Sequence, residues 1–458
     1  MSPRTGAVAP RAPRRRAGSS SSDAALVLAT FTVLLIAIPS QLAVKELGGW
    51  ATPAMVLAFG LLAWWCAGRL VPSLGLERRS NPLRVAVGLF GASLLTSYAV
   101  GFLHPLSGLG ARSADRDMLF GAGLIGVSLI TMDGIRSRRR LDFVIKVVVV
   151  VGSFSAFLGL LSFFFGYYPL NRLHIPGLSA TTGLAFEGVR SDFRRVAGTA
   201  RHPIEFGVMM AMIFPLALTL AFNTPKPKNR RWWVCFVMIA SVLPMSLSRS
   251  AIIGVTCAAG VLWMSWPRQR RIRALIVTPL YLGVMRLMIP GLLGTLRNLF
   301  THASKDSSIS HRTDNYKRIG AIVRHQFLFG SGFGTYIPDR ADYVLDNAYL
   351  GHLIETGIIG LGILLTMFFM GYFCARGARR RSVDPYFRDQ AQALAAAIAV
   401  VLPAWFTFDA FGYPMATGTA FLLLGCCGAA WRLAKNEQEA REWAGLTTAA
   451  PARSSAAS

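Results

Sequence analysis

Residues 143–168 read FVIKVVVVVGSFSAFLGLLSFFFGYY, and this run decides the fold. The run holds a single charged residue, Lys146, and it exceeds the length of about 20 apolar residues with which a helix crosses a bilayer. A basic cluster, Arg136–Arg140, lies just before it. The same arrangement recurs along the chain, which is typical of a polytopic helical membrane protein.

The other apolar runs extend this pattern in both directions. They predict an all-α polytopic membrane protein with about 12 transmembrane helices. The predicted spans are residues 24–40, 50–68, 83–103, 118–132, 143–168, 203–222, 232–247, 251–266, 274–290, 350–374, 390–410 and 414–431.

The composition agrees with this class. Of 458 residues, 53% are hydrophobic and only 15% are charged, whereas an ordinary soluble domain is about one quarter charged. A disordered chain, a secreted disulfide scaffold and a cytosolic enzyme are therefore excluded. The cysteines lie in or beside apolar runs without CxxC spacing, so we interpret them as small buried hydrophobic residues, with no metal or disulfide role.

The net charge of +26 has two possible explanations, nucleic-acid binding or the anchoring of helix ends. With twelve spans, every basic cluster falls on the same side of the membrane. The positive-inside rule then places both termini in the cytoplasm, and nucleic-acid binding loses its support. The clusters are Arg14–Arg16, Arg78–Arg79, Arg136–Arg140, Lys226–Arg231, Arg268–Arg273 and Arg376–Arg381.

The chain divides into three parts. Residues 1–23 are predicted to be a disordered basic cytoplasmic segment, residues 24–431 a membrane domain, and residues 432–458 a disordered cytoplasmic tail. The basic start resembles a signal peptide, but no clear cleavage site follows, so the first run is interpreted as an uncleaved helix. Two predicted outer loops, at about 169–202 and 291–349, are longer than the others and carry arginines, which suits an anionic substrate.

Two arginines stand out on the outer side. Arg201 precedes Pro203 at the start of an apolar helix, where free N–H groups and a guanidinium together suit a pyrophosphate; a snorkelling arginine is the alternative. Arg249 sits in a tight turn between two runs and predicts an anionic partner, either a substrate phosphate or a structural ion pair.

The second outer loop predicts an amphipathic helix on the membrane surface. Tyr316 and Phe327 belong to an apolar stripe at helical spacing, with basic residues off that stripe. The glycines that follow, Gly330, Gly332 and Gly334, are interpreted as a flexible turn. They are not a nucleotide-binding loop, since the strand–loop–helix context is missing.

Polar residues then gather before and within the next long run. Asp346, Asn347, Tyr349 and Glu355 are predicted to cluster at the outer membrane border. Asp346 is a candidate base for a sugar hydroxyl or a helix N-cap, and Glu355 is a candidate for either catalysis or buried hydrogen bonding. Further candidate bases are His302, His311, His325 and His352.

These residues resemble the O-antigen ligase and O-antigen polymerase superfamily over about residues 190–375. The resemblance rests on the order, spacing and outward placement of several weak motifs. They are Arg-x-x-Gly-Thr at 195–199, Ser248-Arg249, the stretch from Arg312 to Gly334, Asn347-x-Tyr-Leu, and Glu355-x-Gly-x-x-Gly360.

The resemblance implies a GT-C-like glycosyltransferase of the bacterial cell envelope, located in the inner membrane and without a cofactor. Such proteins take a glycan from a polyprenyl-pyrophosphate carrier, such as undecaprenyl pyrophosphate, and pass it to a glycan or lipid acceptor outside the membrane. By position, Arg249 and Arg312 match the paired arginines that hold the pyrophosphate. The remaining substrate-binding candidates are Arg195, Arg201, Arg318, Asn347, Tyr349 and Glu355.

One position departs from the family pattern. Ligases of the family often carry a histidine before the asparagine of the His-Asn pair, and here that position is Asp346. The departure favours a polymerase. The implied mechanism is metal-independent, with Asp346 as the base and arginines stabilising the leaving pyrophosphate.

Three other classes remain open. A transporter or lipid flippase also fits twelve spans, although mid-span charges are few, Glu205, Arg286 and Asp409 being the nearest, and the two halves show no repeat. A membrane glycoside hydrolase would use a carboxylate pair such as Asp342 and Asp346. A non-enzymatic scaffold is opposed only by the basic outer loops.

Overall fold

A computed structural model describes most of the chain. It covers residues 23–47, 51–71, 76–77, 79–181, 183–184, 188–190, 193–301, 320, 323–324, 326–337 and 345–449. Helices make up 75% of the structure, and the few strands are very short.

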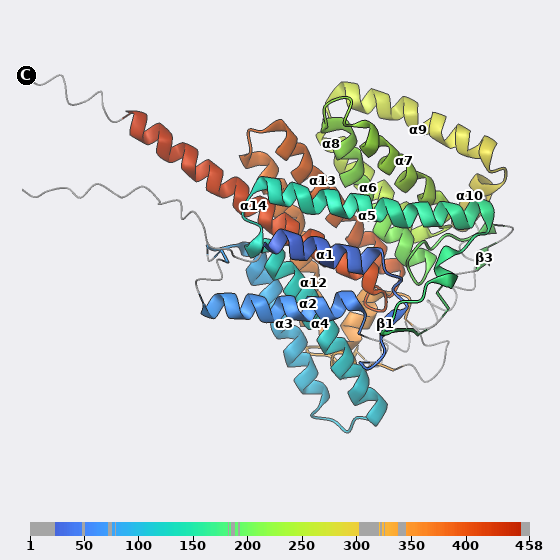
Figure 1. The fold of residues 1–458 in the computed structure, drawn as a ribbon. Helices are drawn as coiled ribbons and strands as arrows, with labels where there is room; N and C mark the ends of the chain where they lie inside the picture. Colours follow the sequence, from blue (N-terminus) through green and yellow to red (C-terminus); the bar gives the residue numbers. More distant parts are fainter. Residues whose placement is uncertain are drawn as a thin grey trace, which may run out of the picture.

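Most of the helices follow one another through the chain with short connections, and the two long connections lie between α5 and α6 and between α10 and α12 (Figure 1). They are α1 Ala24–Ile36, α2 Pro53–Leu70, α3 Pro82–Gly101, α4 Gly108–Gly134, α5 Arg138–Phe165, α6 Pro203–Asn223, α7 Arg230–Met245, α8 Arg249–Ser265, α9 Arg268–Met288, α10 Leu292–Thr301, α12 Ala348–Arg381, α13 Pro385–Ala404 and α14 Pro414–Ala449, with the 3₁₀ turns η2 Pro169–Arg172 and η5 Trp405–Thr407.

Two small antiparallel pairings lie in the segments that the sequence places outside the membrane. Strand β1, Leu42–Val44, pairs with β2, Leu178–Ala180, and β3, Val189–Arg190, pairs with β4, Phe193–Arg194. The first pairing fastens the first long outer loop to the chain that follows α1, and the second lies within that loop.

The prediction of an all-α polytopic membrane protein is confirmed. Each of the twelve predicted runs lies on a helix, but the number of full-length spans is smaller than expected. Within the described residues, eight helices are long and apolar enough to cross a membrane, or nine if α9 and α10, bent by 112°, form one broken span. Helices α1 and α8 are shorter.

Two predicted boundaries change. Helix α14 continues to Ala449, so residues 432–449 are helical, in contrast to the disordered tail predicted there. The predicted run at 118–132 is the inner part of a longer helix, α4, which begins at Gly108. The predicted surface helix around Tyr316 lies almost wholly outside the described residues.

The core of the bundle is formed by α6, α13 and α14. Between 78% and 89% of their span windows are buried, against 28% for α2. Small side chains explain the close packing of α13, where Ala391, Ala393 and Ala395–Ala397 are all fully buried. Helix α9 lies at the edge of the bundle (Figure 1), and its Tyr281 hydroxyl donates to the Ala240 carbonyl of α7 at 2.8 Å.

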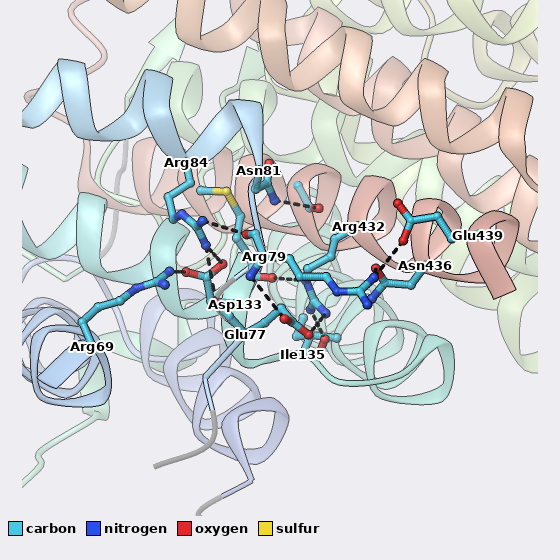
Figure 2. A network of polar contacts seen from close by, with 12 residues as sticks. Arg69, Glu77, Arg79, Asn81, Arg84, Asp133, Ile135, Arg432, Asn436 and Glu439 are labelled. Carbon is cyan, nitrogen blue, oxygen red and sulfur yellow. Dashed lines mark hydrogen bonds and ion pairs between the residues drawn. The ribbon is translucent and has the colours of Figure 1, made fainter. Parts of the chain in front are cut away.

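A polar network joins α2, α3, α4 and α14 at the end of the bundle predicted to be cytoplasmic (Figure 2). Asp133 of α4 is fully buried and forms ion pairs with Arg69 and Arg84, the latter at 3.1 Å. The Trp65 indole N–H donates to the same carboxylate at 2.9 Å. Arg432 of α14 donates to the carbonyls of Met132 and Ile135, at the C-terminal end of α4.

Replacing Asp133 by alanine should destabilise the bundle. The change leaves Arg69 and Arg84 facing each other without the buried carboxylate that neutralises them, a loss of about 3 kcal/mol. A markedly lower thermal unfolding midpoint of purified protein in detergent is expected. Glu46→Gln, at an exposed site, is the control and should stay near the parent value; equal midpoints for both variants would contradict the role of the network.

Candidate functional site

A cavity of about 330 Å³ lies at the opposite end of the bundle from the polar network. Its walls come from the start of α4, the segment 333–336, the start of α12 and residues 409–414, together with Arg201, two residues before α6, and Thr52, the N-cap of α2. By the positive-inside prediction, all of these are outer ends. The charged or ionisable side chains that line it are Arg116, Asp117, Arg201, His352, Glu355 and Asp409, with Tyr336.

A break in α12 shapes this cavity. Gly357 has φ 67 and ψ −172, so the helix cannot continue its regular hydrogen bonding there. The segment 327–332 inserts at the break. Its amides Ser331 and Gly332 donate to the carbonyls of Ile354 and Glu355 at 2.8 and 3.0 Å.

The inserted segment also accepts hydrogen bonds from the backbone N–H groups that follow the break. The amides of Ile358 and Ile359 donate to the carbonyls of Phe327 and Leu328, at 2.9 and 3.4 Å. A regular helix would have paired these two amides with the carbonyls of Ile354 and Glu355. The inserted segment therefore replaces both lost helical hydrogen bonds in full.

Glycines make the insertion possible. Gly330, Gly332 and Gly334 have φ values of 73, 117 and 73, which favour glycine. A Cβ on Gly330 would approach the Glu355 carbonyl oxygen to 2.2 Å. The glycines interpreted from the sequence as a flexible turn are thus closely packed, Gly330 against α12, Gly332 against α3 and Gly334 against α4.

Glu355 is oriented by this same segment. Its carboxylate faces the backbone N–H groups of Gly334 and Tyr336, and its side chain lines the cavity. The carboxylates of Asp117 and Asp409 lie close enough to interact with it electrostatically. Three acidic groups from three elements therefore meet at one place.

Asp409 lies in the loop between η5 and α14. Burial is the largest cause that raises the pKa of this carboxyl to about 6, and the charges of Asp117 and Asp346 act in the same direction. The backbone N–H groups of Gly412 and Phe411 oppose the shift. The loop geometry thus holds a carboxyl that titrates close to neutral pH.

Arg201 reaches the cavity from the start of α6. The backbone N–H of Arg201 donates to the Glu205 carboxylate at 3.0 Å, and the Met415 N–H of α14 donates to the same carboxylate at 2.8 Å. Glu205 is fully buried. The helix end where we expected a free anion site therefore already holds a carboxylate of the protein, which joins α6 to α14.

His202 completes this helix end. Its Nδ1 accepts a hydrogen bond from the Ile204 N–H at 3.2 Å. Burial, together with the charge of Arg195, lowers the pKa of His202 to about 4, so its ring is neutral near pH 7. Positive charge at this corner therefore comes from the arginines.

Arg195 and Arg249 lie at the turn between α7 and α8, outside the cavity wall. The Arg195 Nε donates to the Ser246 carbonyl at 3.3 Å. Arg249 is half-buried and begins α8, whose N-cap is Ser248. The next residue, Ser250, bonds the Thr407 hydroxyl at 2.6 Å, which brings this turn beside the segment leading to Asp409.

The predicted cluster before α12 has mixed roles. The N-cap is Asn347, whose Oδ1 accepts from the Tyr349 and Leu350 amides at 3.0 and 3.3 Å. The Tyr349 hydroxyl donates to the Leu402 carbonyl of α13 at 2.8 Å. Both side chains thus have packing roles, whereas Asp346 is exposed beside the cavity and is not the helix cap.

Of the predicted site residues, the structure brings Arg201 and Glu355 together in the cavity wall, with His352. Asp346 lies close enough to act on the Asp409 carboxyl. Arg312 and Arg318, with His302, His311 and His325, lie outside the described residues.

Two acidic residues of the cavity were missed or misread. The apolar pattern of α4 is interrupted near its start by charged residues, Arg112, Arg116 and Asp117. The sequence analysis therefore placed the start of this helix too late and did not identify Asp117 as a site residue. Asp409 had been considered only as a mid-span charge. The signal in its case was the sequence Asp409-Ala-Phe-Gly-Tyr-Pro414, whose glycine and proline indicate a turn between two spans.

Comparison with known proteins adds a family. The model of the family described as O-Antigen ligase matches residues 233–365. The match runs from α7 into α12 and contains Arg249, Asp346 and Glu355. No curated protein matches the chain.

Gly357→Ala should disrupt the break in α12. A Cβ there would lie 2.2 Å from the Leu328 carbonyl oxygen, and the left-handed backbone alone costs about 1–3 kcal/mol for a residue other than glycine. We expect a lower thermal unfolding midpoint and faster amide hydrogen exchange at Ser331 and Gly332.

The matched control is Gly362→Ala in the same helix. A Cβ at Gly362 meets nothing within 4 Å, and alanine favours the helix by up to about 1 kcal/mol. Equal stability and exchange in the two variants would show that the insertion does not depend on Gly357.

Proposed function

We propose that this chain, a member of the O-antigen ligase and polymerase superfamily, is a glycosyltransferase that acts at the outer face of the membrane. It would transfer or polymerise a polyprenyl-pyrophosphate-linked oligosaccharide onto an acceptor glycan. The observation that carries the proposal is the cavity at one end of a membrane bundle, where carboxylates lie beside arginines and part of the wall comes from the matched region.

The reaction would proceed by direct displacement. An acceptor hydroxyl loses its proton to Asp346 and attacks the anomeric carbon of the lipid-linked sugar. The bond from that carbon to the pyrophosphate oxygen breaks, and the polyprenyl pyrophosphate leaves as an anion. The leaving pyrophosphate needs a cationic partner, which in this proposal is supplied by protein side chains and not by a metal ion.

Arginines are proposed to supply that partner. Arg249 and Arg312 would hold the pyrophosphate, with Arg195, Arg201 and Arg318 as further contacts. A fixed group that stabilises developing charge typically contributes about 3–4 kcal/mol to lowering the barrier. The buried Nε of Arg201, which has no hydrogen-bond partner among the described residues, supports a ligand at this corner.

The position of Asp346 supports its role as the base. Its neighbours Leu345 and Ala348 line the cavity, while Asp346 itself is exposed at the edge. Because the Asn347 side chain caps α12, the Asp346 carboxylate is not needed for that purpose. A hydroxyl bound in the cavity would therefore meet Asp346 next to the arginine-bearing turn.

A transporter or flippase is the rival proposal. A transporter would use ionisable groups buried in its spans to bind its substrate or a coupling ion. This rival has less support, because two buried carboxylates of the spans are already paired within the protein. Asp133 pairs with Arg69 and Arg84, and Glu205 accepts from backbone amides.

The direct test is the product formed by purified protein in proteoliposomes with a polyprenyl-pyrophosphate oligosaccharide. A ladder of longer lipid-linked chains is expected for a polymerase, and a single transfer to an added acceptor for a ligase. Movement of the donor across the bilayer without any covalent product would overturn the proposal in favour of the transporter.

Arg249→Ala and Arg312→Ala should each abolish transfer while leaving membrane insertion intact. Loss of one group that stabilises the leaving pyrophosphate corresponds to a rate decrease of about 100- to 1,000-fold. The control is Arg297→Ala, on the exposed side of α10, which should keep the parent rate. Near-normal rates for both test variants would reject the assignment of these arginines.

A further inference from the structure

Helix α9 is attached to the bundle along only one half of its length. Of its described residues Met285 alone is buried, and the Tyr281 hydroxyl donates to the Ala240 carbonyl of α7 at 2.8 Å. Both contacts follow Pro279, which lies inside the helix. Because proline removes a helical hydrogen bond, a helix changes direction most easily there. Pro279 therefore divides α9 into an attached outer half and an inner half, residues 268–278.

The inner half of α9 is uncovered on the face toward the bundle as well as on the other faces. The side chains of residues 275–277 are between 59% and 64% exposed. Thr278 lies two helical turns before Met285 and so shares its face, yet Thr278 is exposed where Met285 is buried. The bundle therefore stops covering α9 at this level.

The matching part of α7 is uncovered too. Val237 and Val234 lie one and two turns before Ala240, the residue that Tyr281 contacts, and both are more than half exposed. An unfilled space in the hydrocarbon layer loses van der Waals contacts on both walls, whereas lipid chains pack well against apolar side chains. We therefore expect lipid chains in the space between α7 and the inner half of α9, here called the inner wedge.

Basic side chains gather where α7 and α9 begin, at the inner end of this wedge. Arg270 pairs with Asp389 at 2.8 Å, but none of the others forms an ion pair with a residue that the structure describes. At the same end of the bundle, by contrast, Arg138 pairs with both Asp384 and Glu437. The basic residues of the wedge are Lys226, Lys228, Arg230, Arg231, Arg268, Arg270, Arg271 and Arg273.

An aromatic cluster connects the two basic helix starts. Phe222 of α6 packs edge-on against Trp233 of α7 and Trp266 of α8, with ring centroids 5.2 and 6.3 Å apart. Trp266 directly precedes Pro267, the N-cap of α9. Tryptophan is enriched at the headgroup level of membranes. The arginines beside these rings therefore lie at the depth of lipid phosphates.

We propose that the inner wedge binds an anionic phospholipid of the leaflet predicted to face the cytoplasm. The lipid phosphate lies among Arg230, Arg268 and Arg273, and the acyl chains fill the space beside α9. Each basic side chain near the membrane surface strengthens such binding by about fivefold. The site is independent of the proposed glycosyl transfer.

Charge distinguishes this ligand from other occupants of the wedge. A second copy of the chain would bring the same basic cluster, and like charges oppose that contact. The polyprenyl pyrophosphate of the proposed reaction carries its charge at the outer end, so it leaves the inner arginines without a partner. A zwitterionic lipid supplies no net negative charge to them.

The first test measures lipid binding to purified protein by native mass spectrometry. Phosphatidylglycerol should bind more tightly than phosphatidylcholine with the same acyl chains, by about tenfold or more. The triple variant Arg230→Gln/Arg268→Gln/Arg273→Gln should reduce this preference to about threefold or less. All three positions are exposed, so its thermal unfolding midpoint in phosphatidylcholine should equal that of the wild type.

The matched control is Arg139→Gln/Arg380→Gln/Arg388→Gln, which removes the same charge from exposed residues at the same end of the bundle. This control should keep the preference for phosphatidylglycerol. Phosphatidylglycerol should also raise the unfolding midpoint of the wild type and of the control, but not that of the test variant. An equal preference in the two triple variants would overturn the site.

Photocrosslinking locates the lipid. In liposomes with equal parts of the two phospholipids, Thr278→p-benzoylphenylalanine should form adducts with phosphatidylglycerol in excess by about threefold or more. The same substitution at Leu95, an exposed position of α3, should give adducts in equal parts. A cross-link between two copies, equal adducts at Thr278, or adducts chiefly with added polyprenyl pyrophosphate would each overturn the proposal.

Discussion

The exchange of backbone hydrogen bonds at Gly357 is the constraint on which the outer half of the molecule depends. A broken helix within a membrane leaves peptide groups that no lipid can satisfy, so such a break persists only where the protein supplies partners. Here the inserted segment donates two backbone N–H groups to the carbonyls of Ile354 and Glu355. Two of its own carbonyls accept from the amides of Ile358 and Ile359. That insertion brings Phe333 and Tyr336 into the cavity wall and orients Glu355.

The two ends of the bundle treat charge in opposite ways. At the end predicted to be cytoplasmic, Asp133 is enclosed by Arg69 and Arg84, so its charge stabilises helix packing. At the other end, Glu355 and Asp409 face a cavity with backbone amides as neighbours. Ion pairs thus fix the helices at one end, while buried carboxyl groups line a cavity at the other. The formal total of +26 conceals this division.

Hydropathy predicted the location of every long helix in this fold because apolar length is a local property. It failed at helix ends, where Arg112 and Asp117 interrupt the apolar pattern of α4 although the helix continues through them. The site was predictable only in part. Arg201 was identified by its position at a helix start and Glu355 by the polar cluster to which it belongs, but the convergence of Asp117 and Asp409 on Glu355 depends on packing between distant segments. Local patterns likewise cannot show that Asn347, and not Asp346, caps α12.

The inserted segment has a consequence for how such a site diversifies. Its attachment to α12 uses main-chain groups almost throughout, aided by the Ser331 hydroxyl at 3.2 Å from the Ile354 carbonyl oxygen. Main-chain pairing tolerates exchange of the side chains, provided the glycines with left-handed geometry stay. Positions such as Phe333 and Tyr336 can therefore vary while the frame that presents them is kept. The architecture separates the residues that hold the site together from those that determine which ligand it accepts, so new ligand preferences can arise without loss of the fold.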